Sequence, residues 1–194
     1  MTVLLIAGSP SAPSRSAVLL DAVAARLAER DVPVERLAIR ELAAHALLLG
    51  EASHPSVQRA VEQVRRADVI VIATPVYKAA YSGVLKVFLD LLPQSALKGK
   101  TVLPLATGGS PHHMLALDYA LRPVLQSLAA RHILPGVYAT DGQVTLQPEG
   151  AYQLQADLGQ RLDDAVDTLA SEGLKLPPEW GFESVAFDQV RCSV

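Results

Sequence analysis

Residues 3–23 read VLLIAGSPSAPSRSAVLLDAV, an apolar run that gives way to a loop of hydroxyl-bearing residues and then to a second apolar pattern. Four consecutive apolar side chains at its start predict a strand covered on both faces, as in a parallel sheet flanked by helices. Glycine, proline and serine within residues 8–16 end that strand, and Leu19, Val23 and Leu27 then recur at helical spacing. The stretch therefore predicts a helix that begins directly after a serine-rich loop.

The serine-rich loop has the chemistry of a phosphate site. The first N–H groups of a helix lack partners within the helix and lie at the positive end of its dipole, so they bind anions. Ser9, Ser14 and Ser16 add hydroxyl donors, and Arg15 adds a permanent positive charge with several N–H donors. The alternative is that Ser14 or Ser16 only caps the helix, but the loop holds more donors than one cap needs.

Two well-known nucleotide signatures are missing from the chain. It contains neither the GxGxxG pattern of dinucleotide sites nor the GxxxxGK[ST] pattern of triphosphate sites. A serine-rich loop without those glycines or that lysine fits a single terminal phosphate, such as that of FMN, better than a pyrophosphate. The loop is therefore interpreted as a monophosphate site.

Size and composition fit one domain without a nucleic-acid or membrane partner. The chain has 194 residues, half of them hydrophobic, and a net charge of -3, so it buries a large core and has no basic block for a nucleic-acid backbone. Cys192 stands alone, which excludes an internal disulfide and a cysteine metal cluster within one chain. Met1 leads directly into the first strand, and no apolar run approaches the ~20 residues of a membrane span, so we expect a cytoplasmic protein.

The apolar pattern predicts five strands that alternate with helices. After the first strand, further strands are expected at 33–42, 68–75, 101–106 and 131–140. The second is expected to be edge-like, and Pro135 and Gly136 interrupt the fifth, which also suits an edge. The alternation predicts a flavodoxin-like, doubly wound, five-stranded parallel α/β sheet with helices on both faces.

Helices are expected between these strands and after the last. They are predicted to begin in the serine-rich loop, at His54–Pro55, at Gly83, after residue 110, and at Ala151 for a final helix over 151–172. In the long helix after residue 110, the candidate buried side chains are those of Leu115, Leu121, Leu125 and Leu128. The segment 42–53 is interpreted as a loop or a single helical turn.

The fold rule for such sheets indicates where a ligand binds. Ligands of doubly wound sheets lie at the carboxyl ends of the strands. Three loops rich in glycine, serine, threonine and proline follow strands here, at 8–16, 74–82 and 107–113. We call these the three rim loops, and we expect them to form one site.

Four motifs lie at the rim and in the helix beyond it: AGSPSAPSRS (7–16), ATPVYKAAYSGVLKVFLDLLP (73–93), LPLATGG (103–109) and LALDYALRPVL (115–125). With them the chain resembles the NADPH-dependent FMN reductases, and among these the reductase components of two-component alkanesulfonate monooxygenase systems. The likeness covers about residues 1–170. It implies hydride transfer from NADPH to FMN, with FMN exchanged as a substrate, and supply of reduced flavin to a partner monooxygenase in sulfur acquisition.

The resemblance also implies a role for each rim loop. The first would hold the FMN phosphate through Ser9, Ser14, Arg15 and Ser16. The second would line the ribityl chain and one edge of the ring through Pro75, Val76 and Tyr77. The third would approach the pyrimidine side through Thr107, Gly108, Gly109 and Ser110. Many relatives carry a polar pair after the tyrosine of the second loop, whereas this chain has Lys78, Ala79 and Ala80.

Catalytic and metal-binding side chains are not expected. Because the cofactors supply the chemistry of hydride transfer, no protein acid or base is predicted to be indispensable. His112 and His113 are neighbours in sequence and point apart on a helix, so they predict no metal site. His113 lies at the mouth of the third loop, where we expect it to contact the nicotinamide or the flavin rim.

Pro123 predicts an irregularity in the long helix. It has no N–H, so the carbonyl of Tyr119 loses its usual partner, and the helix must kink or form a π-type bulge. In the sulfonate-system reductases a tyrosine at this place forms a π-helix at a subunit interface and is linked to flavin exchange. Tyr119 matches it, and the resemblance implies a homotetramer; otherwise Tyr119 is a core or interface side chain in a kinked helix.

Two readings of function stay open beside the reductase. One is a flavodoxin-type electron carrier that retains FMN, and the other is a quinone or azo-dye reductase. Carriers usually have strongly acidic faces, whereas this chain has a net charge of only -3. Residues 1–173 are expected to form the reductase domain, and the tail 174–194, which holds Trp180 and Phe182, is expected to pack on the body or on a neighbouring subunit.

Overall fold

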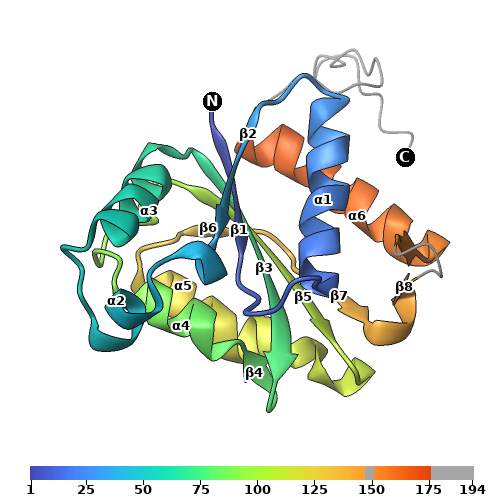
Figure 1. The fold of residues 1–194 in the computed structure, drawn as a ribbon. Helices are drawn as coiled ribbons and strands as arrows, with labels where there is room; N and C mark the ends of the chain where they lie inside the picture. Colours follow the sequence, from blue (N-terminus) through green and yellow to red (C-terminus); the bar gives the residue numbers. More distant parts are fainter. Residues whose placement is uncertain (147–150, 176–194) are drawn as a thin grey trace, which may run out of the picture.

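The computed structural model describes residues 1–146 and 151–175 (Figure 1). Its main sheet is parallel, with the strands in the spatial order β2 (Val34–Ala38), β1 (Val3–Ala7), β3 (Val69–Tyr77), β5 (Thr101–Gly108) and then β6 (His132–Ile133). A further segment, β7 (Val137–Thr140), continues along β5. This is the flavodoxin-like order, so the predicted fold is confirmed.

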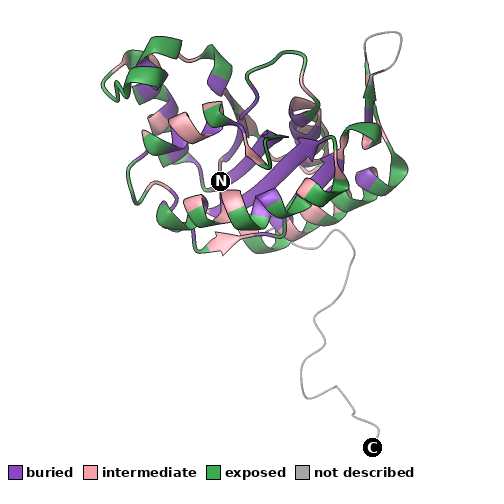
Figure 2. Ribbon diagram, turned by 90° about the horizontal axis from the view of Figure 1, so that it is seen from below, coloured by how far each residue is buried: buried purple, intermediate pink, exposed green. Residues whose placement is uncertain are grey.

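Helices cover both faces of the sheet, and each face has its own core (Figures 1 and 2). One face carries α1 (Arg15–Ala28) and α6 (Ala156–Thr168), and the other carries α2 (Ala44–Leu49), α3 (Pro55–Arg66), α4 (Gly83–Asp90) and α5 (Arg122–Ser127). Alternate residues of β1 contribute to the two cores. Val3 and Leu5 pack on the face covered by α1 and α6, while Leu4 and Ile6 pack on the opposite face. Burial on both faces explains the continuous apolar runs.

The fifth strand is interrupted as expected. β6 and β7 both pair with β5, and Pro135 and Gly136 lie between them. A Cβ on Gly136 would lie 2.8 Å from Leu117 Cδ1 and 3.0 Å from the Pro104 carbonyl oxygen, so the close approach requires glycine.

The segment after residue 110 is not one continuous helix. It consists of a 3-10 helix, Pro111–Leu115, then five residues in π-helical conformation, Leu117–Leu121, and then α5. We call Leu117–Leu121 the first π turn. The expected burial is confirmed for Leu121, Leu125 and Leu128, but Leu115 is 53% exposed, because the 3-10 segment turns it away from the core.

The C-terminal part differs most from expectation. The predicted start of the final helix at Ala151 was wrong. Tyr152–Leu154 forms a strand, β9, that pairs antiparallel with β8 (Val144–Leu146). The helix α6 begins at Ala156 and ends in a second π turn, Leu169–Gly173. Leu174 is buried in the core beside α1 and α6, and the rest of the predicted tail, from residue 176, lies outside the described residues.

Two smaller elements lie outside the predicted strands and longer helices. The segment 42–53, interpreted as a loop or a single helical turn, contains the six-residue helix α2, which Gly50 ends in the left-handed conformation at φ +70°. The short strand β4 (Ala80–Tyr81) pairs with the end of β3. Within the described residues, none of the helices combines the length and the apolar character that a bilayer span requires.

Candidate functional site

Strand register brings the three rim loops together. Ala7 at the end of β1 is level with Ala73 on β3, and Pro75 on β3 is level with Thr107 on β5. Because the strands are parallel, the loops that follow them open at the same edge of the sheet (Figure 1). They enclose a cavity of about 270 Å³ lined by Ser9, Ser11, Pro13, Ser14, Arg15, Pro75, Val76, Tyr77, Thr107, Gly108, Gly109, Asp141 and Tyr152.

The first rim loop presents hydroxyls and helix N–H groups to this cavity. Ser14 is the N-cap of α1 and has extended backbone angles, but its side chain makes no capping bond. Its Oγ lies 2.9 Å from Ser16 Oγ instead. The first helical bonds run from the N–H groups of Ala17 and Val18 to the Ser14 carbonyl oxygen, so the Arg15 and Ser16 N–H groups precede them. The reading of Ser14 as a simple cap therefore finds no support.

Arg15 faces the cavity from the first turn of α1. Its Nε donates to the Val144 carbonyl oxygen at 3.1 Å, and one terminal nitrogen lies 3.8 Å from Asp141 Oδ2. The side chains of Arg15 and Asp141 are 43% and 48% exposed, so both remain open to a ligand and to water. The guanidinium is thus held by β8 while its terminal N–H groups stay available.

The second rim loop is anchored on the first. The Ser82 hydroxyl donates to the Gly8 carbonyl oxygen, and the Ser82 N–H donates to Thr74 Oγ1 at 3.0 Å. Pro75 and Val76 are buried, whereas Tyr77 is 49% exposed at the start of the turn into β4. Lys78 and Ala79, the two residues of that turn, have φ of +51° and +64°, which is the backbone of a type I′ hairpin. The tight turn directs Tyr77 outward at the rim.

The third rim loop packs against β7. A Cβ on Gly108 would lie 2.5 Å from Tyr138 Oη and 3.3 Å from Val76 Cβ, so any side chain here would force Tyr138 to move. The Tyr138 hydroxyl donates to the Ser110 carbonyl oxygen at 2.6 Å. Burial, and secondly the negative charge of Asp141, raise the pKa of Tyr138. The hydroxyl therefore stays protonated as a donor and fixes the loop.

Three predicted residues do not line the cavity. Ser16 is buried behind Ser14, the Ser110 hydroxyl accepts the His112 N–H at 3.3 Å as the cap of the 3-10 helix, and His113 lies half-exposed within that helix. Sequence reasoning missed Ser11, Pro13, Asp141 and Tyr152. Asp141 follows β7 directly and begins a short 3-10 helix, so extending the carboxyl-end rule to the fifth strand would have found it.

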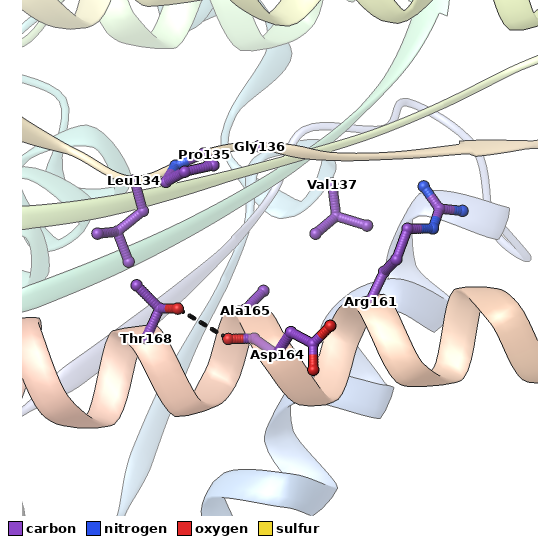
Figure 3. Close-up of a pocket in the computed structure, with 8 residues that line it drawn as sticks. All are labelled: Leu134, Pro135, Gly136, Val137, Arg161, Asp164, Ala165 and Thr168. Carbon is purple, nitrogen blue, oxygen red and sulfur yellow. Dashed lines mark hydrogen bonds between the residues drawn. The ribbon is translucent and has the colours of Figure 1, made fainter.

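A second cavity, of about 230 Å³, lies between α6 and the break separating β6 from β7 (Figure 3). Its polar groups are already engaged: Arg161 donates to the Tyr138 carbonyl oxygen at 2.8 Å, and the Thr168 hydroxyl donates to the Asp164 carbonyl oxygen at 2.9 Å. It shares no lining residue with the rim cavity. The rim cavity, at a helix N-terminus where the Arg15 and Ser16 N–H groups precede the first helical bonds, is the stronger candidate.

The donor set at the rim fits a mononucleotide. Helix N–H groups, serine hydroxyls and Arg15 suit a phosphate, while Pro75, Val76 and the backbone at Gly108 and Gly109 allow a flat ring to come close. Fold and site together define a flavodoxin-like α/β protein with a candidate mononucleotide site at the carboxyl ends of β1, β3 and β5.

Comparison with known proteins narrows this class. The family model "NADPH-dependent FMN reductase" matches residues 1–145. The chain is 48% identical over 168 residues to the FMN reductase (NADPH) of Escherichia coli K12, and the aligned region covers 87% of each of the two chains. It is 35% identical over 156 residues to the NADH-dependent FMN reductase SfnE of Pseudomonas putida, covering 74% of this chain and 79% of that one.

Solved structures agree with these relatives. The apo form of an NADH:FMN oxidoreductase superposes with a TM-score of 0.79 at 40% identity, over 92% of this chain and 91% of that chain. The chain belongs to the NADPH-dependent FMN reductase family. It is therefore an oxidoreductase that uses FMN and a reduced nicotinamide nucleotide, and the family predicted from the four motifs is confirmed.

Proposed function

We propose that the protein transfers a hydride from NADPH to FMN that binds and leaves in each turnover, and that the reduced FMN serves a separate monooxygenase. The observation that carries the proposal is the cavity in which a serine-rich helix N-terminus meets the two other rim loops. NADPH is favoured as donor because two relatives at 48% identity are named as NADPH enzymes, while the NADH-dependent relatives, the solved NADH:FMN oxidoreductase included, are 33–40% identical.

Each rim loop has a separate task in this proposal. Ser9, Ser14 and Arg15 hold the FMN phosphate, with Ser16 supporting Ser14 from behind. The second loop, at Pro75, Val76 and Tyr77, lines the ribityl chain and a ring edge. The third loop, at Thr107, Gly108 and Gly109, meets the pyrimidine side, with Ser110 and His113 at its margin.

The protein supplies binding and orientation. FMN, when bound, supplies the two-electron acceptor, so the chain's residues need only hold the ring in place beside the nicotinamide. The buried loops suit that task, because Ser82, Thr74 and Gly8 fix the first and second loops to each other by hydrogen bonds. No acid or base at the rim is required for this reaction.

Steady-state NADPH oxidation by the full-length protein, with and without added FMN, tests the proposal. Turnover is expected to depend on added FMN in a saturable way and to be slower with NADH. A purified protein that is yellow and needs no added flavin would instead support the quinone or azo-dye reductase or the electron carrier. A protein that does not oxidise NADPH would contradict the reductase.

We propose further that flavin exchange involves assembly into a homotetramer around the first π turn. Four large side chains are exposed on the second rim loop, the 3-10 helix and the first π turn: Tyr77, Met114, Leu115 and Tyr119. Tyr119 is the most exposed, at 79%. Apolar surface of this kind beside a candidate site is typical of subunit interfaces.

Deleting Tyr119 tests this part. The deletion removes the extra residue of the π turn, so ordinary helical register and retention of FMN through purification are expected. Tyr119→Ala keeps the register and removes only the exposed ring, which makes it the matched control. Absorbance of the purified proteins and their mass by light scattering are the measurements; a colourless, fully active deletion variant would contradict the role.

The partner is proposed to be a monooxygenase that consumes reduced FMN to oxidise an alkanesulfonate. Support comes from the four motifs at the rim and in the helix beyond it, which resemble those of the reductases in such systems. Release of sulfite from an alkanesulfonate by a monooxygenase of this type, with this protein and NADPH as the sole source of reduced flavin, is the expected result. Absence of sulfite despite rapid NADPH oxidation would contradict this partner.

A further inference from the structure

We propose that Asp141 competes with the flavin phosphate for Arg15 and thereby keeps FMN exchangeable. The inference rests on the proposed function, because it assumes that the phosphate binds at the head of α1. Asp141 lies at the rim, in the segment after β7, and its carboxylate is the negative group paired with Arg15 across the cavity. A carboxylate beside a phosphate site repels the negatively charged phosphate and therefore weakens its binding.

The carboxylate of Asp141 lies between two rim loops. Its Oδ2 is 3.8 Å from the terminal nitrogen of Arg15, and a Cβ on Gly109 would lie 3.7 Å from the same oxygen. Asp141 begins a short 3-10 helix in which the Thr140 N–H donates to Gln143 Oε1 at 3.0 Å. This local capping fixes the backbone at Asp141, whose side chain lines the cavity.

Asp141 is not needed to orient Arg15. The guanidinium is already oriented by the hydrogen bond from its Nε to the Val144 carbonyl oxygen at 3.1 Å. The 3.8 Å separation from Asp141 is longer than a hydrogen bond and is therefore an electrostatic contact only. Such a contact is readily exchanged for a phosphate oxygen, which forms shorter, charge-assisted bonds with the same N–H groups.

The negative charge of Asp141 also acts electrostatically on groups near it. It contributes to the raised pKa of Tyr138, whose hydroxyl belongs to the third rim loop through Ser110. A phosphate at the first loop would experience the same charge and would bind more weakly than to a neutral rim. Because both partners are about half exposed, we expect a moderate effect, about fivefold in affinity, of the size measured for solvent-exposed ion pairs.

The test compares FMN with riboflavin, which has the same ring and no phosphate. Dissociation constants are measured for the full-length protein by quenching of flavin fluorescence at low ionic strength. Asp141→Asn is expected to bind FMN about fivefold more tightly and to leave riboflavin binding unchanged. Asp141→Ser removes the same charge with a shorter side chain and should reproduce the gain. Asp90→Asn, at an exposed ion pair with Lys86 on α4, is the control for net charge.

A second arm tests whether Arg15 mediates the effect. In an Arg15→Gln background Asp141 has no guanidinium to compete for and only its direct repulsion of the phosphate remains, so Asp141→Asn is expected to give a clearly smaller gain in FMN affinity. The inference is overturned if Asp141→Asn leaves FMN affinity unchanged or weakens it, if riboflavin gains equally, or if the full gain persists with Arg15→Gln. A wild-type protein that binds neither flavin would instead contradict the proposed function, and the inference with it.

Discussion

The loops after β1, β3 and β5 and the segment after β7 meet at one cavity but are built differently. The three rim loops are tied to the buried sheet, since the Gly8 N–H donates to the Ala73 carbonyl oxygen at 2.8 Å and Ser82 bonds back to Gly8. The segment after β7 approaches from outside, with Asp141 exposed and Tyr152 half-buried on a two-stranded hairpin. The first region can hold a ligand rigidly, and the second can adjust how tightly it is held.

The largest effect is expected from the first region. Arg15→Glu replaces the positive donor at the head of α1 with a negative group, and we expect FMN affinity to fall about 100-fold, or ~3 kcal/mol. Riboflavin should lose much less, because it has no phosphate to repel. Fluorescence titration with both flavins measures the difference.

Arg65→Glu, on the exposed face of α3, makes the same change of net charge away from the rim and serves as the control. Equal losses of FMN and riboflavin with Arg15→Glu would mean that Arg15 supports the ring and not the phosphate. The assignment of the phosphate to the first rim loop would then be wrong.

An intermediate effect is expected where the two regions touch. Gly108→Ala places a Cβ 2.5 Å from Tyr138 Oη, so the buried tyrosine must move and lose its bond to the Ser110 carbonyl oxygen. We expect a loss of about 2 kcal/mol in the free energy of unfolding. Urea denaturation measures it, and Gly142→Ala, with no atom within 4 Å of the new Cβ, is the matched control. Equal stability of the two variants would contradict the close packing of the third loop on β7.

The smallest effect is expected from Tyr138→Phe, which removes only the hydroxyl. Loss of its bond to the Ser110 carbonyl oxygen is expected to lower the free energy of unfolding by about 1 kcal/mol at neutral pH. Burial, and secondly the charge of Asp141, raise the pKa of Tyr138. As pH rises, this hydroxyl therefore loses its proton at a lower pH in the unfolded chain than in the folded protein. Its stabilisation is therefore full below the usual tyrosine pKa and is lost as pH rises through the raised pKa.

Unfolding in urea at neutral pH and about one unit above the usual tyrosine pKa separates these contributions. The wild type is expected to lose more stability than Tyr138→Phe over this interval. Tyr81, whose pKa burial also raises, is present in both proteins, so their difference isolates Tyr138. Identical pH dependence in the two proteins would contradict a protonated Tyr138 as the support of the third loop.

The rim was predictable because its residues lie at the carboxyl ends of strands. Ser9 follows β1, Pro75 and Thr107 lie in the last residues of β3 and β5, and parallel pairing brings such ends to one edge whatever else packs around them. Residues that failed to reach the cavity, such as Ser16 and Ser110, are used locally instead. Their chemistry is visible in the sequence, but the direction of a hydroxyl depends on backbone angles that it does not reveal.

The hairpin after β7 could not be predicted from its residues. Leu154 lies four residues before Leu158 and eight before Leu162, so it continues the helical stripe of α6 although it belongs to β9. Three strand residues are too few to show an alternation of their own. Pairing with Val144, which lies earlier in the chain, decides the outcome.

The alternation of strands and helices along the chain, the two-faced burial of the strands and the serine-rich head of α1 were determined by local sequence, because apolar spacing and turn residues act over a few positions. The pairing of Arg15 with Asp141 and the packing of Gly108 on Tyr138 were decided only in the folded chain. Those contacts join residues far apart in sequence, and a contact of that kind depends on the positions of whole elements and not on the character of either residue.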